Sequence, residues 1–443
     1  MRWGALFQEG RARLTLGVLL VEFLVAVQAL VVTAIMPAVE RDLGGLAYYG
    51  LAFSGFSIAA LVAAPTAGRA TDRRGPALPF LLFGAAFIAG TILSGLAPSM
   101  PLLALTRVLQ GYGAGGWYTV SLVAIARSYP ESGRARMLAL LAGAWIIPGL
   151  LGPSYGAIMA TTLGWRWAFV SVVPLIVLAT LLALPALGAL PRTEDSAQHL
   201  GLRWPLQLAI GVFILVAGLS LLSWLTIPAL IAGVWVTWRS LDRILPAGSL
   251  RVDPGLPAAV VTVALLIFAF IVGDYFIPLL LTGVRGRSLP EAGIVITLGT
   301  VSWSLGNWWQ ARVIGSWRRV DLGRLGTALL LLALFGVSAT LISAPLILAY
   351  SAWFLAGIGM GIAYPTAYLV IMEGAADTGT GSAVSSGEVA ERLALALAGG
   401  IGGASVAVAQ ALHASLAAGL AGAFGLAILA ALLAFAITAR LQR

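Results

Sequence analysis

Long apolar runs separated by short polar segments repeat along the whole chain. A helix needs about 20 apolar residues to cross the hydrocarbon core of a bilayer, so each run predicts a spanning helix. The predicted spans lie near residues 15–37, 47–68, 77–96, 101–126, 136–160 and 166–189, and then near residues 256–282, 290–314, 322–342, 345–371, 382–410 and 415–439. The pattern predicts an all-α polytopic membrane protein whose short loops leave no room for a soluble catalytic domain.

The central apolar stretch, residues 204–240, has a weak break near Ser223 and is long enough for two further spans. Arginine positions test this number, because cytoplasmic loops collect basic residues. With two spans both termini are cytoplasmic, and most loop arginines fall on that side. The arginines left outside are Arg41, Arg166, Arg285 and Arg287. One span would invert the second half, and none would leave a long apolar segment in water, so we expect fourteen helices.

The polar segments divide the chain into three parts. Residues 1–190 are predicted to form an N-terminal six-helix bundle, and residues 256–443 a C-terminal one. Residues 191–255 hold cytoplasmic linkers and the two additional helices. The first apolar run is too long for a signal-peptide core, so it is expected to remain in the protein as its first helix.

Composition narrows the class of function. Hydrophobic residues make up 60% of the 443 residues and charged residues only 10%, whereas soluble domains carry about 25% charged residues. The absence of cysteine excludes disulfides, thiol catalysis and thiolate metal sites. His199 and His413 lie far apart, so neither a metal nor a cofactor is expected. The net charge of +9 comes from arginines between apolar runs, a topology pattern that does not indicate nucleic-acid binding.

A charged segment, AGRATDRRGP, joins the second and third predicted spans at residues 67–76. Gly68, Asp72, Arg73 and Gly75 resemble the loop signature Gly-x-x-x-Asp-Arg-x-Gly-Arg-Arg of the major facilitator superfamily, although the last two basic residues are missing. The resemblance implies a cytoplasmic gate contact. In it, Gly68 would let another helix approach closely, and Asp72 would pair with an arginine or a helix N-terminus.

The fourth span contains RVLQGYGAGG, residues 107–116, which resembles the superfamily pattern Arg-x-x-x-Gln-Gly-x-Gly-x-Gly. A charge inside an apolar run is costly and by default functional. Arg107 is therefore a candidate for proton coupling. The alternative is that its side chain extends to the membrane interface.

The fifth span contains PGLLGPSYGA, residues 148–157, which resembles the antiporter motif Gly-Pro-x-x-Gly-Gly of this superfamily. The matching residues are Gly149, Gly152, Pro153 and Gly156, with Ala157 in place of the last glycine. Small residues allow close helix packing, and proline permits a bend.

Other segments resemble the fourteen-helix drug:proton antiporter branch, in particular its actinobacterial multidrug or lipid exporters. ALVVTAIMP, residues 29–37, resembles the branch's helix-one motif, but the aspartate of that motif falls on Gln28, which carries no proton. In the second half, the loop signature has decayed to Gly315 and Ser316. The resemblance implies a transporter of the bacterial cytoplasmic membrane that is driven by the proton motive force.

A coupling residue has to bind and release a proton inside the bilayer, and desolvation favours the neutral carboxyl group. The carboxylates within predicted spans are Glu22, Asp274, Glu388 and Glu391. Glu388 and Glu391 share a helix face, whereas the adjacent Arg392 is expected to point elsewhere. Two alternatives remain: Glu388 and Glu391 can lie in water near the inner surface, and Glu22 can pair with an arginine. Glu22 and Asp274 are the preferred proton carriers, because an ionised Asp at a helix centre costs roughly 2.5–3.5 kcal/mol.

The predicted function is proton-coupled export by alternating access, in which two six-helix bundles rock around a central cavity. Candidates to line that cavity are Gln28, Trp117, Trp145, Trp303 and Tyr364. Such aromatic residues favour an amphipathic or aromatic substrate, although they also anchor helices at membrane interfaces. The expected partners are protons, the bilayer and a small lipophilic substrate or lipid, and the expected state is a monomer.

Other functions fit parts of the same pattern. A lipid exporter of the same fold fits the same motifs. An uptake symporter also fits the fold, but the antiporter motif in the fifth span argues against it. A membrane-embedded enzyme would need His, Asp or Ser clustered at one membrane face, which the isolated histidines and short loops do not offer.

Overall fold

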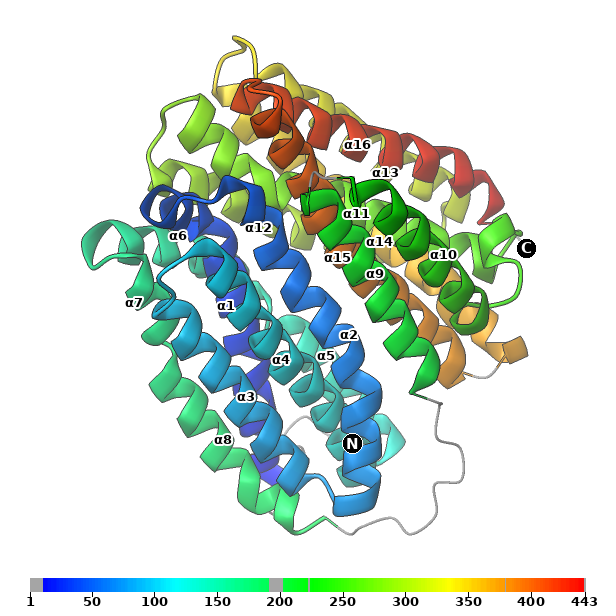
Figure 1. Cartoon of the computed structure of the whole chain (residues 1–443). Helices are drawn as coiled ribbons and strands as arrows, with labels where there is room; N and C mark the ends of the chain where they lie inside the picture. Colours follow the sequence, from blue (N-terminus) through cyan, green and yellow to red (C-terminus); the bar gives the residue numbers. More distant parts are fainter. Residues whose placement is uncertain (1–10, 191–201, 222–223, 379, 442–443) are drawn as a thin grey trace.

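The computed structural model describes residues 11–190, 202–221, 224–378 and 380–441, which form helices joined by short turns (Figure 1). The helices are α1 (Arg11–Leu43), α2 (Tyr49–Arg74), α3 (Ala77–Gly95), α4 (Met100–Ser128), α5 (Glu131–Gly143), α6 (Ile146–Thr162), α7 (Trp165–Val170), α8 (Val173–Gly188), α9 (Arg203–Leu221), α10 (Thr226–Ile244), α11 (Leu256–Leu279), α12 (Leu289–Val313), α13 (Arg319–Ala339), α14 (Ile347–Thr378), α15 (Thr380–Ala411) and α16 (Leu416–Ile437). Within the described residues α5 and α6 form one interrupted segment and α7 and α8 another, so the prediction of fourteen helical segments is confirmed.

The two interruptions each precede a proline. Pro148 lacks the N–H that would bond the carbonyl of Ala144, and its ring collides with that carbonyl. The chain accordingly leaves the α-helical form at Ala144 and Trp145, between α5 and α6. Pro174 stands in the same relation to Val170, the last residue of α7. The predicted spans at residues 136–160 and 166–189 are each found as one candidate span, Arg136–Thr162 and Trp165–Gly188, with the interruption inside it.

The central region forms two helices, α9 and α10, as predicted, while Ser223 and residues 191–201 lie outside the described residues. The two helices pack closely at Gly233, where an added Cβ would lie 2.7 Å from the backbone nitrogen of Leu215. α9 also packs against α2 and α15.

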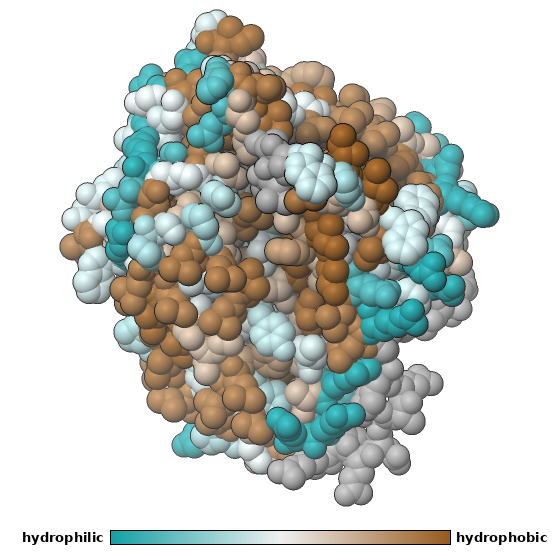
Figure 2. All heavy atoms as spheres, viewed as in Figure 1, coloured by the Kyte–Doolittle hydropathy of each residue, from teal (hydrophilic) through white to brown (hydrophobic). Residues whose placement is uncertain are grey.

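The surface of the molecule suits a bilayer. Among the described residues, ten helices are long and apolar enough to cross a membrane. Large apolar side chains are exposed on several of them, for example Leu82, Leu150, Leu181, Leu332 and Leu433. Figure 2 shows apolar side chains over much of one face, with hydrophilic side chains concentrated at its margins.

The helix pairs with the most extensive packing between the first and second halves of the chain are α2 with α15 and α6 with α12, and we call them the α2–α15 seam and the α6–α12 seam. Both seams are tight toward the 44–48 end of the molecule, where α1 turns into α2. A Cβ added to Gly50 would lie 2.1 Å from the carbonyl oxygen of Gly399 and 2.6 Å from the Cα of Gly403. In the α6–α12 seam, an added Cβ at Gly293 would lie 3.0 Å from the Pro153 carbonyl oxygen.

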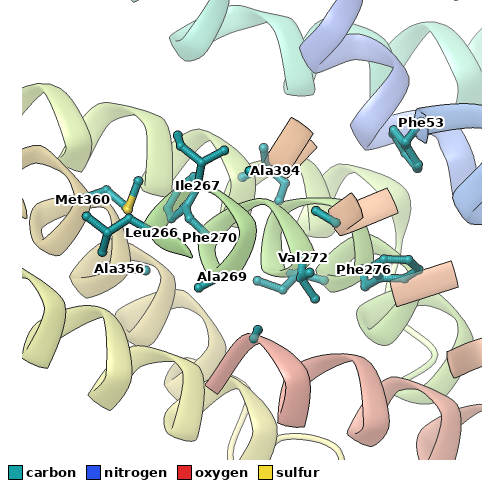
Figure 3. Packing of buried hydrophobic residues seen from close by; sticks show 14 of the residues in the cluster. Phe53, Leu266, Ile267, Ala269, Phe270, Val272, Phe276, Ala356, Met360 and Ala394 are labelled. Carbon is teal, nitrogen blue, oxygen red and sulfur yellow. The ribbon is translucent and has the colours of Figure 1, made fainter. Parts of the chain in front are cut away.

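The largest apolar core is centred on α11. Leu266, Ile267 and Phe270 of α11 are at most 3% exposed. Figure 3 shows them close to side chains of α14, and shows Phe276 farther along α11 on the side of Phe53 in α2. α11 therefore contacts both halves of the chain.

Candidate functional site

Glu22 lies on α1 and is 8% exposed. One of its carboxylate oxygens accepts a hydrogen bond from the indole nitrogen of Trp145 at 2.7 Å. Trp145 occupies the break between α5 and α6 that Pro148 causes. The local helix break thus places an aromatic donor against a buried carboxylate, and the direct partner of Glu22 is a tryptophan rather than an arginine.

A second pair of carboxylates lies on α15. Glu388 and Glu391 are partly exposed, and Glu391 accepts a hydrogen bond from the Tyr364 hydroxyl at 2.9 Å. Arg392 interacts electrostatically with both carboxylates and with Glu22. The expectation that Arg392 points elsewhere was wrong, because it lies one turn beyond Glu388, on the same helix face.

Tyr118 of α4 completes this group. Its hydroxyl interacts electrostatically with Glu22, Glu388 and Glu391, and its ring centroid lies 5.7 Å from the guanidinium carbon of Arg392. Residues from α1, α4, α14 and α15 therefore meet at one polar site. We call Glu22, Tyr118, Glu388, Glu391 and Arg392 the acidic cluster.

Asp274 is separate from the acidic cluster. It is 6% exposed on α11 and accepts a hydrogen bond from the Trp353 indole at 3.1 Å. Gly273 and Gly299 leave space for that indole, because an added Cβ would lie 2.0 Å and 2.6 Å from its ring atoms. The stacked ring of Phe270, with its centroid 4.8 Å away, covers the indole further.

Arg107 is buried, 3% exposed, so it does not extend to the membrane interface. It donates to the Gln110 side chain and, at 3.2 Å, to the carbonyl oxygen of Ala52. Its guanidinium carbon lies 4.4 Å from the centroid of the Phe56 ring. All three partners are neutral. Arg107 also interacts electrostatically with Tyr275, the residue that follows Asp274 on α11.

The candidate gate motif lies where α2 turns into α3. We call this end of the molecule, which is opposite the 44–48 end, the 69–76 end. Asp72 accepts a hydrogen bond from Arg127 of α4 at 2.8 Å, whereas Arg73 is exposed and Gly75 begins the turn with a φ of 75°. The expectation of close helix approach at Gly68 was wrong, because an added Cβ there would meet no heavy atom within 4 Å.

The candidate antiporter motif lies on the faces of α6 that meet α1 and α12. Gly152 and Gly156 face α1, where added Cβ atoms would lie 3.3 Å from Leu30 and 3.1 Å from Val31. Gly149 faces α12, with Thr300 Cγ2 at 2.2 Å from an added Cβ. Pro153 faces Gly293 in the same seam.

The remaining cavity candidates do not all lie together. Trp303 and Tyr364 have ring centroids 5.7 Å apart and lie beside the acidic cluster. Trp117 is fully buried against Phe80 and Phe87 of α3, apart from that cluster. Gln28 is 1% exposed, and neither amide atom has a hydrogen-bond partner among the described residues.

Sequence reasoning anticipated an arginine as one possible partner of Asp72, but it did not identify which residue meets each charged group. Trp353, Arg127, Tyr118 and Tyr275 carry no local signal, because each meets its partner only through helix packing. In the loop with the decayed second motif, Arg319 pairs with Glu373 of α14. The second half thus also has an ion pair at this loop, but here the arginine follows the loop and the carboxylate lies on the neighbouring helix α14.

Comparison with known proteins identifies the class. Residues 18–399 match the sequence model of the Major Facilitator Superfamily. The chain belongs to that superfamily. Among its relatives, an uncharacterised transporter of the same type from Mycobacterium tuberculosis is 28% identical over 288 residues, which cover 60% of this chain and 40% of the relative. The matched region therefore spans less than half of that relative.

Two further comparisons extend over most of this superfamily member. A probable multidrug-efflux transporter from Mycobacterium tuberculosis is 27% identical over 85% of this chain and 84% of its own length. The crystal structure of a bacterial homologue of the human lysosomal transporter Spinster, inward-facing and unoccupied, matches with a TM-score of 0.70. It covers 97% of this chain and 96% of its own, at 17% identity, and shows the fold alone. The superfamily and these relatives comprise multi-pass membrane transporters, not enzymes.

Proposed function

We propose that this transporter exports lipophilic or amphipathic cations in exchange for protons, as a fourteen-helix multidrug antiporter of the bacterial cytoplasmic membrane. Two six-helix bundles, with α9 and α10 added between them, rock around the acidic cluster, and both chain termini face the cytoplasm. A monomer carries out the whole cycle. Glu22 and Asp274 are the proton carriers, and Arg107 tunes the site near Asp274.

The acidic cluster carries this proposal. Three carboxylates lie within reach of one arginine, so the fully ionised cluster has an excess of negative charge. Tyr118, Trp145, Trp303 and Tyr364 add aromatic faces, which attract cations. A protonated cluster would bind a cation weakly, and an ionised cluster would bind it well. Proton and substrate therefore compete for the same groups, as exchange requires.

The driving force depends on stoichiometry. Exchange of one proton for one monovalent cation moves no net charge, so the membrane potential contributes nothing to that cycle. Each unit of pH gradient then sustains about a tenfold substrate gradient, equivalent to about 1.4 kcal/mol. With one net charge moved per cycle, 100 mV would add about 2.3 kcal/mol.

The test is ethidium transport into proteoliposomes under an imposed pH gradient. The natural protein should move ethidium when the gradient is applied and stop when an ionophore collapses it. Glu22→Gln and Asp274→Asn remove the proposed carriers with little change in shape. Glu40→Gln, a carboxylate near the far end of the same helix as Glu22, is the matched control and should transport normally.

The outcomes separate the alternatives. Loss of gradient-driven transport in one carrier variant, with counterflow of ethidium retained, identifies the coupling residue. If the natural protein moves neither ethidium nor a neutral dye under any gradient, the multidrug proposal fails. The same vesicles loaded with fluorescent phospholipid would then test lipid export.

A further inference from the structure

The two seams between the halves differ in what covers them. α9 lies along the α2–α15 seam and packs on both of its helices. One apolar cluster joins Leu61 of α2, Leu208 and Val212 of α9, and Leu393 and Ala396 of α15, all at most 8% exposed. A Cβ added to Gly400 of α15 would lie 2.3 Å from Val216 of α9. α9 therefore fills the groove between α2 and α15.

α10 packs mainly against α9, and Leu241 and Ile244 near its C-terminal end pack against the same apolar cluster. Its side chains Ile227, Ile231 and Trp235 are 69%, 67% and 61% exposed. The α9–α10 pair thus stands between the α2–α15 seam and lipid.

The α6–α12 seam carries no such cover in the described part of the chain. It is closed from Gly293 to Gly149, where an added Cβ would lie 3.2 Å from the Cβ of Thr300. Asn307 is seven residues beyond Thr300, so it continues the same face of α12. Asn307 is exposed, and Trp145 and Ile146, one turn before Gly149, are 39% and 57% exposed. The seam is therefore open toward the 69–76 end.

The open part of this seam leads directly to the acidic cluster. On the α6 side, exposed Trp145 donates to Glu22. On the α12 side, Trp303 lies one turn beyond Thr300 and contacts Tyr364, which donates to Glu391. One aromatic side chain separates the seam from Glu22, and two in series separate it from Glu391.

We propose that α9 and α10 block lateral entry through the α2–α15 seam, and that lipid-dissolved cations reach the acidic cluster through the α6–α12 seam between Trp145 and Asn307. This inference rests on the proposed function, and it names the bilayer rather than water as the source of substrate. An amphipathic cation concentrates at the membrane interface. Entry from there avoids returning its apolar surface to water.

The test uses single cysteines, which the chain accommodates because it has none of its own. Asn307→Cys reports on the open seam, Leu393→Cys on the covered seam, and Ile231→Cys on the lipid-facing surface. A maleimide that dissolves in lipid should label Asn307→Cys at least about tenfold faster than Leu393→Cys, since thiol reactivity follows exposure. Ethidium in the vesicles should slow labelling of Asn307→Cys and leave Ile231→Cys unchanged.

A second pair of variants tests the cover itself. Leu208→Ala with Val212→Ala thins α9 where it meets the α2–α15 seam, and should raise labelling of Leu393→Cys by the lipid-soluble maleimide severalfold. The matched control, Ile231→Ala with Val234→Ala on the outward face of α10, should leave it unchanged.

Two results would overturn the inference. One is equal labelling of Leu393→Cys and Asn307→Cys in the natural background. The other is labelling of Asn307→Cys by a charged, water-borne maleimide but not by the lipid-soluble one. In both cases continued pH-driven ethidium transport would leave the exporter proposal standing. A protein that labels as expected but moves no cation would instead refute the exporter proposal, and with it the seam's role as a substrate route.

Discussion

Three buried or half-buried carboxylates in this transporter share one type of partner. Glu22 is bonded by Trp145, Asp274 by Trp353 and Glu391 by Tyr364, each through a neutral aromatic donor. A neutral donor serves both the carboxylate and the carbonyl oxygen of the protonated group. An arginine in the same place would favour the ionised form alone. These hydrogen bonds are therefore compatible with either protonation state, although Arg392 also interacts electrostatically with Glu22 and Glu391.

A double-mutant cycle tests the contact between Asp274 and Trp353. Trp353→Phe leaves a ring in the space beside Gly273 but removes the donor, and Asp274→Asn removes the charge. Loss of a buried partner costs about 1–3 kcal/mol, so the two substitutions should be non-additive by at least about 0.5 kcal/mol. The measurement is thermal unfolding in detergent. Additive effects would mean that the two side chains do not interact.

For single residues, the sequence predicts the charged groups within the apolar runs but not the side chains that contact them. A carboxylate inside an apolar run is conspicuous, and Glu22, Asp274 and Glu391 were found that way. Trp145 is 123 residues from Glu22 along the chain, and nothing local to either residue indicates the contact. Only the packing of α1 against α6 brings them together.

The crossing of α2 and α15 is close because glycines lie on both helices. The crossing of α2 and α15 brings the backbone of Gly50 against Gly399 and Gly403. The sequence predicts most of these helices to within a few residues, since apolar runs of the required length are unambiguous. The break between α5 and α6 was missed although Pro148 indicates it, because the apolar run continues through it.

Gly50→Ala should destabilise the protein by about 1–3 kcal/mol, the usual cost of overpacking. The added methyl group would meet backbone atoms, which cannot move aside as a side chain can. Gly425→Ala in α16 is the matched control, because a Cβ there meets no heavy atom within 4 Å. Thermal unfolding should show no loss for the control. Equal stability of the two variants would contradict the observed crossing.

The ion pair between Asp72 and Arg127 is partly exposed, at 26% and 18% of the side chains. Such pairs contribute about 0.2–1 kcal/mol to stability. The Asp72→Asn variant should therefore unfold at nearly the same temperature as the unmodified protein. We expect it to slow transport, and we expect the exchange Asp72→Arg with Arg127→Asp to restore part of the rate. Asp321→Asn removes a single ion pair, with Arg318 at the start of α13, and serves as the control. Normal transport by Asp72→Asn would exclude a gating role.

For the whole molecule, the tight contacts in both seams lie toward the 44–48 end, whereas the α6–α12 seam is open toward the 69–76 end. Alternating access requires the contact between Gly149 and Thr300 in the α6–α12 seam to separate during each cycle. A disulfide between Gly149→Cys and Thr300→Cys should prevent this. The two Cβ positions are 3.2 Å apart, slightly shorter than a disulfide's usual 3.5–4.5 Å.

Oxidation of this double variant should abolish ethidium transport, and reduction should restore it. Each single cysteine variant should transport under both conditions. Transport by the oxidised protein, with the cross-link verified by mass spectrometry, would show that the seam stays closed throughout the cycle.

The contact of Gly50 with α15 has a mechanical consequence. It lies at one end of α2, and Arg74 lies at the other, about 36 Å away at 1.5 Å per residue. The contact thus lies at the first turn of α2, so a rotation of the helix about this contact moves its opposite end the most. A rotation of about 10° about Gly50 would barely disturb the contact there, yet by the same helix length it would carry Asp72 sideways by roughly 6 Å. A rotation that leaves the contact at Gly50 intact therefore displaces Asp72 by more than the thickness of an aromatic ring.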